Sequence, residues 1–195
     1  MKKPSAESRL LTLLFFGPPI LVALAVFGPW ELGWLPQVEG PYGQRYDPPT
    51  ELPETSLQTP TGSPTNADWA RGRWSLIYAQ LSVCDGPCLA RLELLRQVRF
   101  GLAEDAELVQ RVYLHGGNIG ALLIEGGLTA ELVIGRVDGP AGAELRRALG
   151  EEGLFGGQIY IADPRGNLVM SYPPDADPQG ILRDLERLLA VSRVV

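Results

Sequence analysis

The sequence has few of the residues that most metal and redox chemistry depends on: two cysteines, two methionines and one histidine in 195 residues. It also lacks an excess of basic residues, because its net charge is −6. Residues 1–9 carry three basic residues and one acid, or +2, which leaves −8 on residues 10–195. A domain with that charge is a poor partner for nucleic acid, whose phosphates need a Lys/Arg surface. The absence of repeats and low-complexity tracts argues against solenoid and fibrous proteins.

Several motifs of common enzyme classes are incomplete. Glycines follow His115 and suggest a phosphate-binding loop, but the G-x-G-x-x-G spacing is not met and no P-loop lysine follows. His115-Gly116-Gly117 also suggests a hydrolase oxyanion loop, yet no serine lies in a G-x-S-x-G elbow. The C-x-x-C spacing that most general thiol–disulfide reductases use is absent too. These three classes are therefore not favoured.

No charged residue occurs between Arg9 and Glu31, and residues 10–30 are mostly apolar. This length is close to the roughly 20 residues that cross a bilayer core, so we expect a transmembrane helix over 10–30. Basic residues precede it and acids follow it, which predicts a cytoplasmic tail at 1–9 and a domain outside the cytoplasm. The alternative is a signal peptide cleaved near Ala23-Leu24-Ala25. The apolar run continues beyond that point to Trp30, which favours a retained anchor.

Residues 31–68 are rich in proline, with seven prolines between residues 36 and 64. Such a stretch disfavours a helix or a central strand, so it predicts an extended linker between membrane and domain. The alternative is that its aromatic part, around Tyr42 and Tyr46, packs on the domain as an N-terminal arm. The folded domain is expected over residues 69–195.

Apolar periodicity in this domain predicts alternating strands and helices. The expected strands span residues 75–81, 108–114, 132–137, 158–162 and 167–172. Helices are expected from Cys88 onward, at 120–125, at 141–149 and after an Asp177 cap. The last two strands are joined by a turn at Asp163-Pro164-Arg165-Gly166. This order predicts an α/β domain with a thioredoxin-like mixed sheet and helices on both faces.

The stretch from Leu76 to Cys88 is where we expect any chemistry. An apolar strand leads into a tight loop that holds Cys84 and Cys88, and the loop opens an amphipathic helix. A cysteine at the start of a helix feels the positive end of the helix dipole, which favours the thiolate. Two thiolates suit Cu(I).

The spacing leaves the state of the two cysteines open. At helical i, i+4 positions their Cβ atoms would lie about 5–6 Å apart, wider than the roughly 3.5–4.5 Å of a disulfide. Gly86 and Pro87 lie between them, so the loop can tighten to form the bond or open to hold a metal. A static disulfide or an inert pair is the competing interpretation, because such cysteines often oxidise outside the cytoplasm.

His115 is the candidate third metal ligand. It follows the 108–114 strand, which we expect to lie parallel to the 75–81 strand, so His115 and Cys84 leave the sheet at the same carboxyl-terminal edge. The alternative is an exposed loop residue. Met170 could approach the same edge, although core packing is the favoured role.

Three segments resemble the SCO/SenC family of thioredoxin-fold proteins that assist assembly of the copper centre of cytochrome c oxidase. They are the strand with Tyr78, Ser82 and the C-x-x-x-C pair, the segment 159–168, and the helix that begins at Asp177-Pro178. The resemblance implies a single-pass inner-membrane protein with a periplasmic domain. It also implies copper as a possible cofactor, and an oxidase subunit or another assembly factor as partner.

The sequence also departs from the family pattern. Phe155-Gly156-Gly157 stands where the family has a histidine ligand, and Asp85 and Leu89 stand where prolines usually follow the cysteines. Two hypotheses follow. In the first, Cys84 and Cys88 handle Cu(I) or exchange disulfides during oxidase assembly. In the second, the domain is a redox-silent interaction module that docks a membrane enzyme.

Overall fold

The computed structural model describes residues 41–59, 62–116, 119 and 131–193, together with Phe16 and Pro18. The chain from Pro41 to Val195 makes one compact unit. Apart from Phe16 and Pro18, the predicted transmembrane segment 10–30 lies outside the described residues, as does the predicted helix at 120–125. Within the described part, no helix is both long and apolar enough to cross a bilayer.

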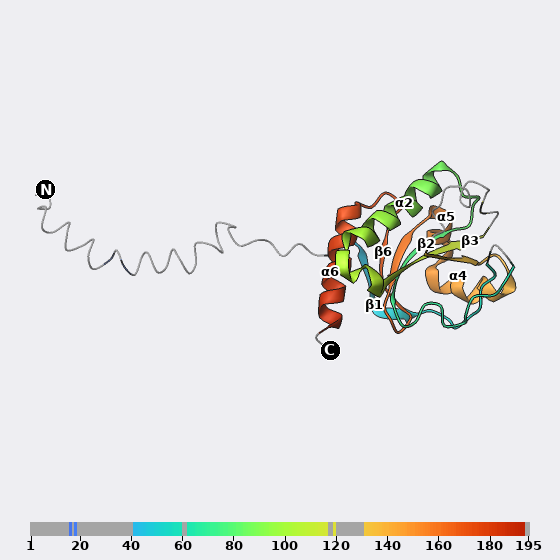
Figure 1. Ribbon diagram of the computed structural model, residues 1–195, viewed down its shortest axis with the longest axis horizontal. Coiled ribbons are helices and arrows are strands. Elements are labelled where there is room, and N and C mark those ends of the chain that lie inside the picture. Colours follow the sequence, from blue (N-terminus) through green and yellow to red (C-terminus); the bar gives the residue numbers. More distant parts are fainter. Residues whose placement is uncertain are drawn as a thin grey trace, which may run out of the picture. The chain divides into compact units, whose positions relative to one another are not determined.

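The described strands form one mixed sheet in the order β1-β6-β5-β2-β3-β4 (Figure 1). Strands β2, β3 and β4 run parallel to one another, whereas β5 lies antiparallel to β2 and β6, and β1 antiparallel to β6. The bounds are β1 Gln44–Glu51, β2 Trp74–Gln80, β3 Val109–His115, β4 Leu132–Arg136, β5 Ile159–Ala162 and β6 Asn167–Tyr172.

Helices cover both faces of this sheet (Figure 1). Alternate residues of each strand point to opposite faces, so Leu76 and Tyr78 of β2 pack under α2 and α6, whereas Ile77 and Ala79 face α4 and α5. The bounds are α2 Gly86–Gly101, α4 Ala143–Leu149, α5 Glu151–Gly156 and α6 Pro178–Ser192, with short 3₁₀ helices at Ala103–Leu108 and Pro140–Gly142. The result is the predicted thioredoxin-like arrangement.

The elements with strong local signals form where the sequence predicts them. Each of the five expected strands is present, with ends shifted by no more than one residue. Helix α2 buries Cys88, Leu92, Leu95 and Val98, the four residues that its periodicity selects. Helix α6 begins after Asp177, whose side chain accepts a hydrogen bond from the Gln179 amide at 3.1 Å.

The predicted linker at 31–68 requires a correction, because part of it belongs to the domain. Strand β1 pairs with β6, and Leu52 and Leu57 are 0% and 1% exposed. The folded unit therefore begins at Pro41 instead of residue 69. An edge strand tolerates prolines, and Pro48 and Pro49 lie where the pairing register shifts, between Arg45 and Thr50.

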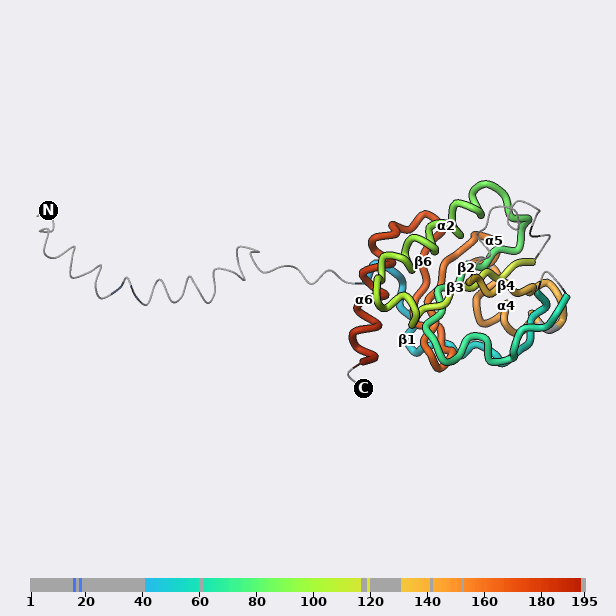
Figure 2. The backbone as a smooth tube through the Cα atoms, in the orientation of Figure 1, coloured from blue at the N-terminus to red at the C-terminus, as the bar shows by residue number. Residues whose placement is uncertain are grey.

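The alternative interpretation of this segment, an N-terminal arm around Tyr42 and Tyr46, is confirmed. The Tyr42 hydroxyl accepts a hydrogen bond from Arg183 of α6 at 2.6 Å, and Tyr46 packs against the core on the α4 side. The connection from β1 to β2 then passes along the domain (Figure 2), and Leu57 packs closely against Gly135 of β4.

Candidate redox and copper site

The loop between β2 and α2 holds both cysteines, and the structure joins them in a disulfide. Their Cα atoms lie 5.2 Å apart. Cys84 precedes the Asp85 cap and lies outside the helix, whereas Cys88 lies in the first turn of α2. The pair is thus not held in the i, i+4 geometry of a regular helix. Of the two states that the spacing leaves open, the loop here adopts the tightened one.

Asp85 fixes the start of the helix and, with it, the position of Cys88. Its side chain accepts a hydrogen bond from the Cys88 amide at 3.1 Å, and its carbonyl accepts one from the Leu89 amide at 2.9 Å. Pro87 occupies the first turn, where a missing amide hydrogen costs nothing. In the sequence, Asp85 stands out only as a departure from the family pattern, whereas in the structure it is the N-cap of α2.

The two cysteines differ in their access to solvent. Cys84 is 5% exposed and Cys88 is fully buried, while Val83, directly before them, is 59% exposed. Of the two, only Cys84 keeps any solvent exposure, so we expect an incoming thiol to attack Cys84 first. Because both cysteines belong to the core cluster under α2, the disulfide also crosslinks the loop to the core.

Sequence reasoning missed Tyr113, which contacts the disulfide from β3. Its hydroxyl oxygen lies 3.5 Å from Cys88 Sγ, and because a disulfide sulfur carries no hydrogen, the hydroxyl donates. The Tyr113 ring stacks on the rings of Tyr78 and His115, each with centroids 5.7 Å away. Burial raises the pKa of Tyr113 well above the ordinary tyrosine value, so its hydroxyl stays protonated at neutral pH.

Tyr78 lies beside this contact, but its hydroxyl donates its hydrogen bond to a group other than the disulfide. Its hydroxyl donates to the Gln80 side-chain carbonyl, and the Gln80 amide donates to the Ser82 hydroxyl. Burial, the largest cause, raises the pKa of Tyr78 to about 12. A Cβ added at Gly157 would lie 3.0 Å from the Tyr78 hydroxyl. Tyr78 thus approaches the backbone where a histidine ligand would be expected from the family resemblance.

His115 is the last residue of β3 and is 5% exposed, so it is not an exposed loop residue. It lies beside Gln80 of β2, as the parallel pairing of β2 and β3 predicts. Within residues 41–59, 62–116, 119 and 131–193, no group of three or more His, Cys, Asp or Glu side chains could hold a metal. The structure therefore joins Cys84 to Cys88. His115 lies next to Tyr113 and forms no ligand group with the two cysteines.

Met170 packs in the core, which is the role that its sequence position favours. It lies in the cluster under α2 and α6 and is almost fully buried. Its Sδ atom is 3.4 Å from the Tyr172 hydroxyl.

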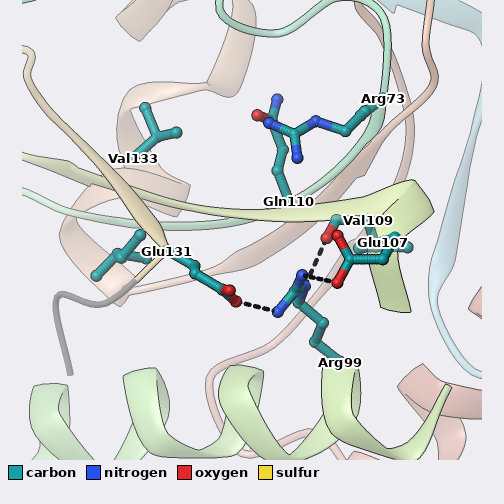
Figure 3. A pocket seen from close by; sticks show the side chains of 8 residues that line it. Arg73, Arg99, Glu107, Val109, Gln110, Glu131 and Val133 are labelled. Carbon is teal, nitrogen blue, oxygen red and sulfur yellow. Dashed lines mark hydrogen bonds and ion pairs between the residues drawn. The ribbon is translucent and has the colours of Figure 1, made fainter. Parts of the chain in front are cut away.

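A cleft of about 330 Å³ lies at the opposite edge of the sheet, where β3 and β4 begin (Figure 3). Arg99 crosses it, pairing with Glu131 and Glu107 and donating from Nε to the Val109 carbonyl at 2.8 Å. Arg73 is the other cation among the lining residues. Arg99 thus faces two carboxylates, and these ion pairs tie α2 to the residue that precedes β4.

A mixed sheet between two helical layers, with a cysteine pair where β2 meets α2, defines a thioredoxin-like protein. Residues 74–192 match the family model described as "Transmembrane-like, thioredoxin-like, C-terminal domain", and the chain belongs to this family. No curated protein matches the chain.

Solved structures with this fold include several Sco proteins. Apo Sco1 from Thermus thermophilus is 16% identical with a TM-score of 0.60, over 78% of this chain and 99% of that one. Copper-bound yeast Sco1 is 16% identical with a TM-score of 0.53, over 78% and 94%. BsSco is 13% identical with a TM-score of 0.53, over 78% and 97%. The domain therefore has the SCO/SenC-like thioredoxin fold that the sequence predicts.

Proposed function

We propose that this chain is a membrane-anchored, thioredoxin-like assembly factor for cytochrome c oxidase, with its domain in the periplasm. Cys84 and Cys88 would act by handling Cu(I) or by thiol–disulfide exchange. The observation that carries the proposal is the disulfide that closes the loop between β2 and α2 in a Sco-like fold. Among structures of this fold, BsSco is described as a cytochrome c oxidase assembly protein with a disulfide switch, and yeast Sco1 has bound copper.

The residues of the loop fit both Cu(I) handling and thiol–disulfide exchange. Reduction of the disulfide by two electrons and two protons gives two thiols in one loop. As thiolates they are soft ligands suited to Cu(I), which is the cargo in this proposal. The start of α2 favours negative charge on Cys88. His115 is proposed as a third ligand of the reduced protein, because it lies on the same sheet face as the cysteines and imidazole binds copper.

The test is genetic and compares four strains: wild type, a deletion of the whole chain, Cys84→Ser/Cys88→Ser, and the control Val83→Ser. Val83 lies in the same loop and is exposed, so its change to serine leaves the sulfur chemistry intact. We expect the double-cysteine strain to lose oxidase activity and oxidase-bound copper as fully as the deletion, and the Val83→Ser strain to keep both. Normal oxidase in all four strains would contradict a role in its assembly.

A redox-silent docking module is the second candidate, and the burial of both cysteines in the core cluster favours it. In that case the double-cysteine strain assembles oxidase normally while the deletion does not. Copper stoichiometry of the reduced, purified chain separates copper handling from docking. Copper handling predicts one Cu(I) per chain that is lost in Cys84→Ser, whereas a docking module binds none.

A further inference from the structure

We propose that Tyr113 is a catalytic hydrogen-bond donor that stabilises the Cys88 sulfur as it leaves the disulfide. This role rests on the proposed thiol–disulfide chemistry and adds a residue to it. The Tyr113 hydroxyl and Cys88 Sγ are 3.5 Å apart. Both residues are 0% exposed, so bulk water has little access to replace the Tyr113 hydroxyl as hydrogen-bond donor. The donor is therefore part of the folded core.

The exchange that this contact serves begins at the more accessible cysteine. A thiolate of a dithiol reductant attacks Cys84 Sγ and forms a mixed disulfide, and the Cys84–Cys88 bond breaks. Its electron pair moves to Cys88 Sγ, which leaves as a thiolate and later takes a proton from solvent. The second thiolate of the reductant then attacks the reductant sulfur of the mixed disulfide. This step releases Cys84 as a thiolate and converts the dithiol to its own disulfide.

The charge that develops on Cys88 needs a local donor, because burial disfavours a charged sulfur. The start of α2 supplies part of the stabilisation, but the Cys88 amide itself is directed to the Asp85 carboxylate. The Asp85 charge opposes a second negative charge nearby. The Tyr113 hydroxyl is the donor that contacts the sulfur, and its hydrogen bond strengthens when the acceptor becomes ionised.

Tyr78 provides a matched control within the same stack. Its ring lies parallel to that of Tyr113 with an interplanar angle of 14°. Its hydroxyl donates to Gln80 instead of to sulfur. The changes Tyr113→Phe and Tyr78→Phe each remove one oxygen from one of two neighbouring buried rings. They differ in whether that oxygen contacts Cys88.

The experiment measures, on the purified full chain at pH 7, the equilibrium and the rate of disulfide reduction by dithiothreitol. For Tyr113→Phe we expect the reduction rate to fall about tenfold, because the leaving thiolate is less stabilised. The reduction equilibrium should stay within about twofold of wild type, because Cys88 takes a proton after it leaves and the reduced protein holds a neutral thiol. For Tyr78→Phe both values should stay within twofold of wild type. Circular dichroism melting confirms that each variant is folded.

Two results would overturn this role. One is a Tyr113→Phe variant whose reduction rate stays within twofold of wild type. The other is an equal loss in Tyr78→Phe, which would assign the effect to packing of the rings. Both leave the proposed function standing, since the wild-type disulfide still cycles. A wild-type disulfide that dithiothreitol cannot reduce reversibly would overturn thiol–disulfide exchange and the role of Tyr113 together.

Discussion

Replacement of Asp184 by alanine should release the N-terminal arm from the domain. Asp184 lies on α6 and is 2% exposed. Its Oδ2 atom accepts hydrogen bonds from the Tyr42 amide at 2.7 Å, the Gly43 amide at 3.1 Å and the Tyr172 hydroxyl at 3.1 Å. One carboxylate thus joins the beginning of the folded unit, the end of β6 and α6.

Asp184→Ala removes the acceptor of these three hydrogen-bond donors. The expected loss of stability is the cost of leaving those donors without a partner. A buried polar group without a partner costs about 1–3 kcal/mol. The Gly43 and Tyr172 bonds are buried and the Tyr42 bond is partly buried. Allowing for partial relaxation of the arm, we expect the free energy of unfolding to fall by about 3 kcal/mol. Asp184→Asn keeps an oxygen acceptor without the charge, so it should lose only about 1 kcal/mol.

Urea unfolding of the full chain, followed by circular dichroism, measures these differences. Limited trypsin digestion adds a local readout, because Asp184→Ala should speed cleavage after Arg45 in β1. The control is Glu186→Ala, an exposed position on the same helix, which should change stability by less than about 0.5 kcal/mol. A loss below about 1 kcal/mol for Asp184→Ala, with unchanged cleavage at Arg45, would refute the anchoring role.

Three further predictions concern single side chains. Asp85→Ala removes the N-cap of α2 and should lower the free energy of unfolding by about 1 kcal/mol in urea titrations. If His115 is a ligand, His115→Ala should weaken Cu(I) binding by the reduced chain about tenfold in a competition titration, whereas equal affinity would remove it from the site. The side-chain hydrogen bond from Arg96 lowers the pKa of Glu93 to about 2. The contribution of this pair to the stability of the fold is therefore present above the ordinary carboxyl pKa and is lost as pH falls towards 2. In Arg96→Gln, NMR should show the pKa of Glu93 move back towards 4.5.

The parts of the fold that the sequence could predict are those whose signal is local. Helix α2 repeats buried residues at helical spacing, and α6 begins with an Asp-Pro cap. The hairpin of β5 and β6 has Gly166 at φ +86° in its turn, a conformation that glycine adopts without strain. Each of these features depends on residues a few positions apart, so a single sequence is enough to reveal it.

The parts that the sequence missed depend on contacts between distant residues. Strand β1 contains Pro48 and Pro49, and only its place at the edge of the sheet makes them acceptable. The carboxylate that secures the arm, Asp184, is more than 140 positions from Tyr42 and Gly43. Likewise, Tyr113 is 25 positions from Cys88. Only the parallel register of β2 and β3 could have indicated that it faces the cysteine loop.

The corrected start of the domain changes the distance over which the cysteines could act. With the expected membrane segment at 10–30, a linker over residues 31–68 would reach about 130 Å when fully extended. With the folded unit beginning at Pro41, only residues 31–40 remain, and they span at most about 35 Å. If the proposed anchor is present, a domain on so short a connection is restricted to partners close to the membrane surface. This restriction would fit the proposed membrane-enzyme target, and it would make the anchoring of the arm by Asp184 relevant to function as well as to stability.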